Sequence, residues 1–484
     1  MGVLSGLKPE KVFKYFEEIT RIPRGSYNEK AVSDYIVGFA RERGLEVYQD
    51  DLYNVIIIKE ASKGREKDPA VILQGHIDMV NEKAPDSSHD FMKDPLDIYI
   101  DGDFIKAKGT TLGGDDGIAV AYMMAILDDP TVDAPRLEMV FTVSEEVGME
   151  GASGIDLSNL KGKLLLNLDS EDEGILLAGC AGGMRGELRL PLSFTDCKDG
   201  KVYELKISGL LGGHSGSEID KQRINADHML ARVLNELMVS GADLKILSMC
   251  GGGKDNAIPF EAAALVRIDD KDKSLFTEKL KAIEESIKNE YRNTDGGVRL
   301  SLEESNVSSD KVLTDESLRK AVGLILAVPN GIVKMSGDIK GLVETSLNLG
   351  IMRTEEDTLI LTYALRSSVD SAKEALRQRV SLIADCFGAK VCYHGAYPAW
   401  EYKKESLLRD KMIRVFEEMY GKKPEVSVIH AGVECGLLAE KIDGLDAISF
   451  GPDLFDIHTV NERLSISSAA RTYDYLLKIL ATRE

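Results

Sequence analysis

The sequence predicts an α/β fold in which a domain with a mostly parallel sheet flanked by helices is interrupted by an inserted α+β domain. A chain of 484 residues exceeds the size at which a single hydrophobic core stops growing, so more than one domain is expected. Short apolar runs at 70–75, 136–144 and 163–169 are separated by helical or glycine-marked segments, which is typical of buried parallel strands. From about Arg185 more polar strands alternate with long charged helices, which indicates a separate domain.

The first domain is expected to begin with a helix that ends before Gly44 and a pair of strands, LEVYQD and YNVIIIKE. The apolar segment 117–129 predicts a helix between the strands at 70–75 and 136–144. After Tyr393 the chain returns to this domain through a helix near 404–419. In open α/β sheets ligands gather beyond the carboxyl ends of the strands, so the residues after each apolar run are the first candidates for a functional site.

The inserted domain is expected to alternate polar strands with three helices, at 215–238, 273–291 and 370–387. The predicted division of the chain is therefore 1–184, 185–393 and 394–484, with the first and last segments forming one domain. No internal repeat is visible in the sequence, but an insertion of about two hundred residues has room for two related halves.

Composition narrows the classes of function. A formal net charge of -21 and a pI near 4.9 disfavour binding to nucleic acid or to an anionic membrane surface, because both need clustered cations. No apolar run approaches the length of a membrane span and the first twenty residues lack a secretory signal, so a cytoplasmic location is expected. The six cysteines form no CxxC pair, which argues against a disulfide framework or a thiolate zinc site.

Five potential metal ligands lie at the ends of the predicted strands or in loops marked by glycine. His76 follows the first apolar run, and Asp78 is two residues further on, where its carboxylate can orient the imidazole. Asp115 lies in the loop GTTLGGDDG, and a carboxylate has two oxygens with which to bridge two cations. The remaining candidates are Glu146, Asp169 and His458.

Glu145 and Glu146 end the strand at 136–144 with no basic neighbour at hand, so a cation is needed to neutralise them at a buried sheet edge. Adjacent residues point in different directions, which lets Glu146 bind a metal while Glu145 acts on water. Each candidate also has an ordinary explanation, such as a core histidine, an N-cap aspartate or a solvated glutamate. Their recurrence at the strand ends and loops of one sheet favours a metal site.

The ligand types indicate the chemistry. Nitrogen and oxygen ligands without thiolate suit zinc, and suit manganese or cobalt nearly as well. Two cations that share one carboxylate lower the pKa of a bound water and polarise a carbonyl oxygen. The sequence therefore predicts hydrolysis of an amide bond.

The motifs LQGHIDMV, TTLGGDDGIAVA, TVSEEVGMEGA, LLNLDSEDEG, GLLGGHSG, DNAIP, RSS, IHAGVECG and FDIHTVNE occur in this order from about residue 5 to the C-terminus. In these motifs the chain resembles the aminoacyl-histidine (Xaa-His) dipeptidases, a branch of a two-zinc family that also holds tripeptidases, carnosinases, aminoacylases and glutamate carboxypeptidases. The resemblance implies a cytoplasmic zinc dipeptidase whose catalytic domain, of the zinc-peptidase type, is interrupted by a lid domain. It allows a homodimer formed through the lid.

The resemblance also implies roles for the candidate ligands. His76 and Asp169 would hold one metal, Glu146 and His458 the other, and Asp115 would bridge the two. Asp78 would orient His76, and Glu145 would be the general base. The loop of the family more often reads Asp-Asn where this chain has Asp115-Asp116, so only Asp115 is carried over as a ligand.

In the inserted domain, His214 matches the lid histidine that donates a hydrogen bond to the oxyanion of the tetrahedral intermediate. Asn256 and Arg366 match lid positions that hold substrate, Arg366 through a bidentate grip on a carboxylate. Gly432 and Glu434 would line the pocket. On the residues alone, a turn histidine is the simpler explanation for His214, and a strand-surface arginine explains Arg366 almost as well.

Hydrolysis of Xaa-His and other dipeptides is therefore the expected function, and three alternatives remain. The first is another enzyme of the same family, such as an N-acyl amino-acid deacylase or a tripeptidase. The second is a non-catalytic metal-binding protein, against which the presence of Glu145 and Asp115 argues. The third is a two-metal phosphatase, against which the lack of a cation cluster for phosphate argues.

Overall fold

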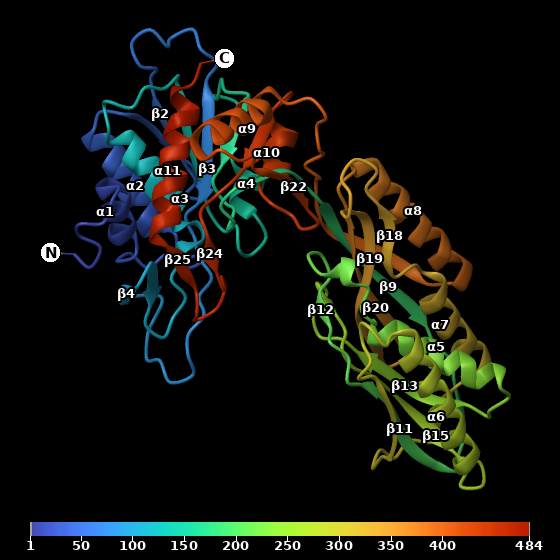
Figure 1. The fold of residues 1–484 in the computed structure, drawn as a ribbon. Coiled ribbons are helices and arrows are strands. Elements are labelled where there is room, and N and C mark those ends of the chain that lie inside the picture. Colours follow the sequence, from blue (N-terminus) through green and yellow to red (C-terminus); the bar gives the residue numbers. More distant parts are fainter. Residues whose placement is uncertain (1, 484) are drawn as a thin grey trace. The chain divides into compact units, whose positions relative to one another are not determined.

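The computed structural model describes residues 2–483, which form two compact units (Figure 1). Unit 1 comprises Met1–Cys180, Tyr402–Val428 and Val433–Glu484. Unit 2 comprises Ala181–Glu401 and the short segment Ile429–Gly432. The sequence predicts a single insertion at 185–393, whereas unit 2 also contains the separate segment Ile429–Gly432.

Unit 1 is built on an eight-stranded mixed sheet. Its strands lie in the order β1 (Glu46–Gln49), β2 (Val55–Lys59), β6 (Leu137–Thr142), β3 (Val71–His76), β7 (Leu164–Asn167), β23 (Asp446–Ser449), β8 (Ile175–Cys180) and β22 (Glu425–Ile429). The four central strands, β6, β3, β7 and β23, run parallel, whereas β1, β2 and β8 make antiparallel pairs. Every residue of β3 and β6 is buried, as their continuous apolar runs indicate. The prediction of an α/β fold is thus confirmed.

Seven helices accompany this sheet: α1 (Glu10–Ile19), α2 (Lys30–Glu42), α3 (Gly114–Leu127), α4 (Glu150–Gly154), α9 (Leu407–Tyr420), α10 (Cys435–Lys441) and α11 (Ile466–Ala481). The predicted helix at 117–129 is confirmed as α3, which lies between β3 and β6 in the chain and is buried along its whole length. Successive strand residues point to opposite faces of a sheet. Leu73 therefore packs into the main core of unit 1, while Gln74 and His76 point to the other face.

A small four-stranded sheet in unit 1 was not predicted. Its order is β24 (Leu454–Phe455), β25 (Arg463–Ser465), β5 (Phe104–Ala107) and β4 (Ile98–Asp101). His458 lies in the loop between β24 and β25, with a left-handed backbone conformation at φ 60°. This sheet therefore anchors both ends of the loop that carries His458.

Unit 2 is built on a nine-stranded antiparallel sheet. Its strands lie in the order β16 (Arg299–Glu304), β11 (Lys201–Ser208), β15 (Ala262–Ile268), β13 (Lys245–Gly251), β19 (Val343–Glu355), β20 (Thr358–Ser367), β9 (Gly182–Pro191) and β21 (Lys390–Tyr397), and β18 (Gly331–Met335) pairs with β19. Two short pairs complete the unit, β10 (Phe194–Asp196) with β17 (Lys311–Leu313) and β12 (Gly213–His214) with β14 (Ala257–Ile258). Every strand pair of this sheet within residues 2–483 is antiparallel.

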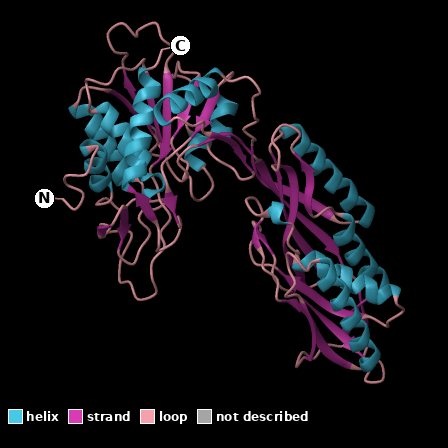
Figure 2. Cartoon of the chain, in the orientation of Figure 1, coloured by secondary structure: helices cyan, strands magenta, loops and turns pink. Residues whose placement is uncertain are grey.

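The helices of unit 2 are α5 (Ala226–Val239), α6 (Lys273–Glu290), α7 (Asp315–Ala327) and α8 (Asp370–Phe387), with a 3₁₀ turn at Ile219–Lys221. They share one hydrophobic core with the sheet and lie along one of its faces, as the cyan ribbons of Figure 2 show. The helix expected at 215–238 is shorter than predicted. It begins at Ala226 because the side chain of Asn225 caps it by accepting the His228 N–H at 3.1 Å.

Unit 2 consists of two halves with the same order of elements. In the first half β11, α5, β13, β15, α6 and β16 follow one another along the chain. The second half has the corresponding elements β9, α7, β19, β20, α8 and β21. Its first strand, β9, precedes the whole of the first half in sequence. In both halves the first strand lies between the third and the fourth, so the halves repeat one topology although the sequence shows no repeat.

No helix within residues 2–483 combines the length and the apolar composition that a transmembrane helix needs.

Candidate metal centre

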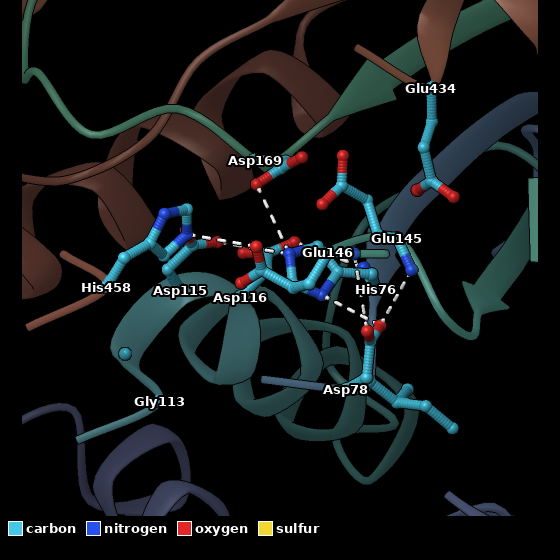
Figure 3. Close-up of polar contacts among 12 residues, drawn as sticks. His76, Asp78, Gly113, Asp115, Asp116, Glu145, Glu146, Asp169, Glu434 and His458 are labelled. Atoms are coloured by element: carbon cyan, nitrogen blue, oxygen red, sulfur yellow. Dashed lines mark hydrogen bonds and ion pairs between the residues drawn. The ribbon is translucent and has the colours of Figure 1, made fainter. Parts of the chain in front are cut away.

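The carboxyl ends of three neighbouring parallel strands in unit 1 supply most of the candidate ligands. His76 is the last residue of β3, Glu145 and Glu146 follow β6, and Asp169 follows β7. Asp115 lies at the start of α3, where its backbone is not yet helical. Because the ends of parallel strands meet at one edge of a sheet, these side chains gather in one cluster (Figure 3).

Asp115 faces two histidines, one with each carboxylate oxygen. Its Oδ1 lies 3.0 Å from His76 Nε2, and its Oδ2 lies 3.2 Å from His458 Nε2. Glu146 joins the second histidine, with Oε2 3.0 Å from His458 Nε2, and Asp169 joins the first, with Oδ1 3.7 Å from His76 Nε2. The cluster thus contains two donor groups that share Asp115.

Three sets of side chains can each place one donor atom within 4.8 Å of the others: Asp115 with Glu146 and His458, His76 with Asp116 and Asp169, and His76 with Glu145 and Glu146. The structure therefore brings all five predicted ligands together. Asp116 accepts the His76 backbone N–H at 3.3 Å and packs against Gly75, where an added Cβ would lie only 2.4 Å from Asp116 Oδ2. Gly75 therefore makes room for Asp116 beneath the cluster.

Asp78 connects the His76 ring to the loop after β6. Its Oδ1 lies 3.2 Å from His76 Nδ1, on the ring nitrogen opposite to the one that faces Asp115. The same carboxylate accepts the backbone N–H groups of Glu145 and Glu146, at 3.1 and 3.4 Å, and the Ser26 hydroxyl at 2.8 Å. A carboxylate in this place fixes both the direction of the imidazole and the position of the glutamate pair.

Two buried side chains that sequence reasoning missed hold the loop before Asp115. The carboxylate of Glu462 accepts four successive backbone N–H groups, those of Leu112, Gly113, Gly114 and Asp115. The guanidinium of Arg24 donates to three carbonyl oxygens, those of Ile77, Asp78 and Gly113. Gly113 has φ 65°, and an added Cβ would lie 2.5 Å from Arg24 Nη2, so only glycine fits there.

The electrostatics of the cluster follow from its burial and its opposite charges. Hydrogen bonds to Asp115 and Glu146 raise the pKa of His458 to about 10. Burial opposes protonation of His76, but its hydrogen bond to Asp115 and the charges of Asp169 and Asp78 raise its pKa well above the ordinary value. Although burial favours the neutral acid, the two histidines hold the pKa of Asp115 below its ordinary value. Burial raises the pKa of Glu145 to about 8.

The donor set fits divalent cations. Glu146 Oε1 is buried without a hydrogen bond, and in residues 2–483 no lysine or arginine forms an ion pair with Asp115, Glu146 or Asp169. A group of carboxylates and imidazoles that is mostly buried, with only His458 exposed, and that forms no ion pair with a basic side chain is suited to binding cations. Its oxygen and nitrogen donors suit zinc, cobalt and manganese.

Glu434, just before α10, lies on the same side of the sheet. Its Oε2 accepts hydrogen bonds from Gln74 Nε2 at 2.5 Å and from Thr142 Oγ1 at 2.7 Å. Gln74 in turn accepts a hydrogen bond from Asn167 at 2.6 Å. Burial raises the pKa of Glu434 to about 7. The carboxylate is thus tied to three neighbouring strands by a buried network.

The remaining candidates lie in unit 2. His214 belongs to β12, and its Nδ1 accepts the backbone N–H groups of Gly216 and Ser217 at 3.3 and 3.1 Å. Burial and the charge of Arg366 lower the pKa of His214. A neutral ring whose Nδ1 accepts a hydrogen bond carries its proton on Nε2, so His214 presents an N–H donor. Asn256 is exposed, and its carbonyl accepts the Ser215 N–H at 2.9 Å.

Arg366 is buried in β20 and donates through Nη1 to the Tyr397 hydroxyl at 2.9 Å, while its Nε is buried and has no hydrogen-bond partner in residues 2–483. Gly216 lies between Arg366 and His214, because a Cβ added there would be 3.3 and 3.0 Å from atoms of their side chains. Gly432 lies against Tyr397, with 2.6 Å between an added Cβ and the ring. In unit 2, Arg366 and Gly432 thus both lie against Tyr397, and Gly216 lies against both Arg366 and His214.

Comparison with known proteins places these features in a family. The model for peptidase family M20/M25/M40 matches residues 72–482. Cytosol non-specific dipeptidase of Escherichia coli (strain K12) is 36% identical over 482 residues, which cover 99% of each chain. The crystal structure of aminoacylhistidine dipeptidase from Vibrio alginolyticus superimposes with a TM-score of 0.92 at 35% identity, over 99% of this chain and 98% of that one.

A tripeptidase from Staphylococcus aureus shares the fold at a TM-score of 0.60 and 15% identity, over 98% of both chains. The match of the family model to most of the chain, together with a relative of more than one-third identity along its whole length, is decisive for membership. The chain belongs to peptidase family M20/M25/M40.

Proposed function

We propose that this protein is a metal-dependent dipeptidase that hydrolyses the peptide bond of Xaa-His and other dipeptides. The observation that carries the proposal is the position of Asp115, whose two oxygens face two different histidines at 3.0 and 3.2 Å. A carboxylate in this arrangement suits two cations that act on one amide. The Escherichia coli and Vibrio alginolyticus relatives, each above one-third identity, are dipeptidases by name, so a deacylase or a tripeptidase is not favoured.

Two divalent cations, most suitably zinc with cobalt or manganese as substitutes, would be held by the clustered donors. His76 and Asp169 would hold one and Glu146 and His458 the other, with Asp115 shared between them. When bound, the cations supply Lewis-acid chemistry, in that they polarise the scissile carbonyl and lower the pKa of the attacking water. Asp78 would keep the His76 ring in place.

Glu145 is the proposed general base. Its backbone N–H is fixed by Asp78 at 3.1 Å, which leaves the half-buried side chain to act on a water beside the ligand Glu146. The Glu145 carboxylate takes a proton from the attacking water and later delivers it to the nitrogen of the leaving amine. A second role as a metal ligand is the competing possibility, and the two roles predict different behaviour on substitution.

Unit 2 carries the proposed substrate contacts. His214 would donate its Nε2–H to the oxyanion, since its neutral ring already accepts hydrogen bonds on Nδ1. Arg366 would bind the carboxylate of the substrate, because its Nε is buried and free of hydrogen bonds within residues 2–483. Asn256, Gly432 and Glu434 would line the substrate pocket.

The inserted residues, predicted at 185–393, would serve as a lid and as the dimerisation domain of a homodimer, while 1–184 and 394–484 would form the catalytic domain. The proposed location is the cytoplasm, which agrees with the name of the Escherichia coli relative. The proposed partner is a dipeptide, with neither nucleic acid nor a membrane, since the net charge is -21.

The test combines metal analysis with a substrate panel. Purified protein should bind two zinc ions per chain and cleave dipeptides, including Xaa-His, far faster than tripeptides or N-acetylated amino acids. Elemental analysis and the ratio of kcat/KM values check this. A metal-replete protein that prefers N-acetylated amino acids would be a deacylase, and a protein that binds no metal at these residues would not be a peptidase of this kind.

A further inference from the structure

Glu434 has one fixed carboxylate oxygen and one without a partner. Oε2 is held by Gln74 and Thr142 at 2.5 and 2.7 Å. Oε1 is buried and has no hydrogen-bond partner among residues 2–483. Burying a carboxylate oxygen without a donor costs free energy, so an oxygen of this kind marks a place where a ligand can donate a hydrogen bond.

The network beneath Glu434 places this oxygen beside the reacting groups. Residues two apart in a strand share a face, so Gln74 lies on the same face of β3 as His76. Thr142 ends β6 just before the loop of Glu145, and Asn167, the donor to Gln74, ends β7 just before Asp169. The charge of Glu434 also contributes to the raised pKa of Glu145. In Figure 3 the Glu434 carboxylate points from its own loop toward the side of the cluster that carries Glu145.

The partner that fits Oε1 is an ammonium group rather than a further metal. None of the potential metal-binding groups in residues 2–483 includes Glu434. Its other oxygen already accepts two hydrogen bonds, which leaves Oε1 to accept from one cationic donor. An ammonium group offers three N–H donors, and its hydrogen bonds to a carboxylate are of the strong, charge-assisted type.

We infer that Glu434 Oε1 binds the free α-ammonium group of the dipeptide substrate, and that Gln74 and Thr142 are positioning residues for it; the inference rests on the proposed dipeptidase function. The α-nitrogen and the scissile carbonyl carbon are bonded to the same Cα and lie about 2.5 Å apart. An acceptor for the ammonium must therefore lie on the same side of the sheet as the group that acts at the carbonyl, and Glu434 meets this condition through its hydrogen bonds to Gln74 and Thr142. A free amino terminus is then a requirement, which excludes N-acyl amino acids.

The test compares two substrates that differ only in the amine, alanyl-histidine and propionyl-histidine. The wild-type protein should favour alanyl-histidine by about 10³-fold or more in kcat/KM, because a site built for a polar group rejects the analogue without it. Glu434→Gln should lower kcat/KM for alanyl-histidine by roughly 10²-fold, leave propionyl-histidine within a few-fold of wild type, and keep both metals. Glu440→Gln, the same change at an exposed site of α10, should alter neither substrate.

Thr142→Val provides a second variant, since it removes one donor to Oε2 without removing the carboxylate. It should reduce the preference for alanyl-histidine over propionyl-histidine, as Glu434→Gln does, but by a smaller factor. Equal losses on both substrates in the Glu434 variant, or a loss of metal measured by elemental analysis, would overturn the inference. Equal cleavage of both substrates by the wild-type protein would do the same, whereas a wild-type protein that cleaves no dipeptide would instead remove the proposed function.

Discussion

Arg24 and Glu462 both bind the backbone of Gly113. The Arg24 guanidinium donates to the Gly113 carbonyl oxygen, and the Gly113 N–H donates to Glu462 Oε2 at 3.0 Å. Both charged side chains are nearly inaccessible, with exposed fractions of 2% and 3%. The direction in which Asp115 leaves this loop is therefore set by residues near the two ends of the chain.

Replacing Glu462 by glutamine tests this support. The amide NH₂ cannot accept the N–H groups that face it, so part of the loop before Asp115 loses its acceptor. Zinc affinity should fall by about 10- to 100-fold, as is usual when a group that orients a metal ligand is changed. Competition with a chelating dye measures the affinity. Glu405→Gln, at an exposed site, is the control, and an unchanged affinity in the Glu462 variant would show that the loop holds Asp115 without it.

Glu145 and Glu146 should respond differently to the same substitution. Glu145→Gln should retain both metals and a near-normal KM while kcat falls by about 10²- to 10⁴-fold, because an amide cannot accept and return the proton. Glu146→Gln should lose metal, since its Oε2 is the atom that lies 3.0 Å from His458, and excess metal should restore part of its activity. Elemental analysis and steady-state kinetics on both variants decide the roles. Metal loss in the Glu145 variant would show that Glu145 is a metal ligand and that it is not the general base.

His214→Ala should lower kcat by about 10²- to 10³-fold, the usual effect of removing one oxyanion donor. Metal content should not change, because His214 belongs to unit 2 and none of the potential metal-binding groups in residues 2–483 includes it. His394→Ala, an exposed histidine of the same unit, serves as the control. Normal turnover in the His214 variant would remove this residue from the mechanism.

Asp227 gives a prediction on stability and pH. Neither of its carboxylate oxygens has a hydrogen-bond partner in residues 2–483, and burial raises its pKa well above the ordinary value of 3.8. Its titratable neighbours, Tyr363 and Cys250, are uncharged near neutral pH and offer no counter-charge. The unfolded chain therefore loses this proton at lower pH than the folded protein does. The contribution of Asp227 to the free energy of unfolding is fully present below about pH 4 and is lost as the pH rises.

Asp227→Asn removes that titration. The melting temperature of the variant should rise relative to wild type between pH 4 and pH 8, and the two proteins should differ least at the acid end. Thermal melts of metal-loaded protein across this range measure the difference. A constant difference between the two proteins at every pH would show that Asp227 has a charged partner in the folded state.

The sequence predicts those features that depend on local pattern. The apolar runs at 70–75 and 136–144 identify β3 and β6 because both faces of these strands are buried, and the position of His76 and Glu145 after them indicates one sheet edge. Local pattern fails where a side chain terminates an element. The charged segment before Ala226 suits a helix by composition, yet the Asn225 cap and the 3₁₀ turn at Ile219–Lys221 end it.

Long-range contacts are beyond such reasoning. Nothing in the sequence around Arg24 or Gln74 indicates that one binds the Gly113 carbonyl and the other binds Glu434. Glu462 lies only four positions after His458 in FDIHTVNE, but its acceptor role exists only once the Leu112–Asp115 loop folds against it. The candidate ligands are predictable because they follow strands, whereas their supports are contributed by segments that meet only in three dimensions.

The arrangement of the two halves of unit 2 has a consequence for the order in which the chain assembles. The first half is contiguous, from β11 at Lys201 to β16 at Glu304, whereas the second half pairs β9 with β20 and β21, which the ribosome makes much later. Contacts between distant segments close slowly because of chain entropy. We therefore expect the contiguous half to form first during synthesis, while β9 remains unpaired until residues 358–397 emerge. The main sheet of unit 1 can be completed only later, because β23, which lies between β7 and β8, is formed by residues 446–449.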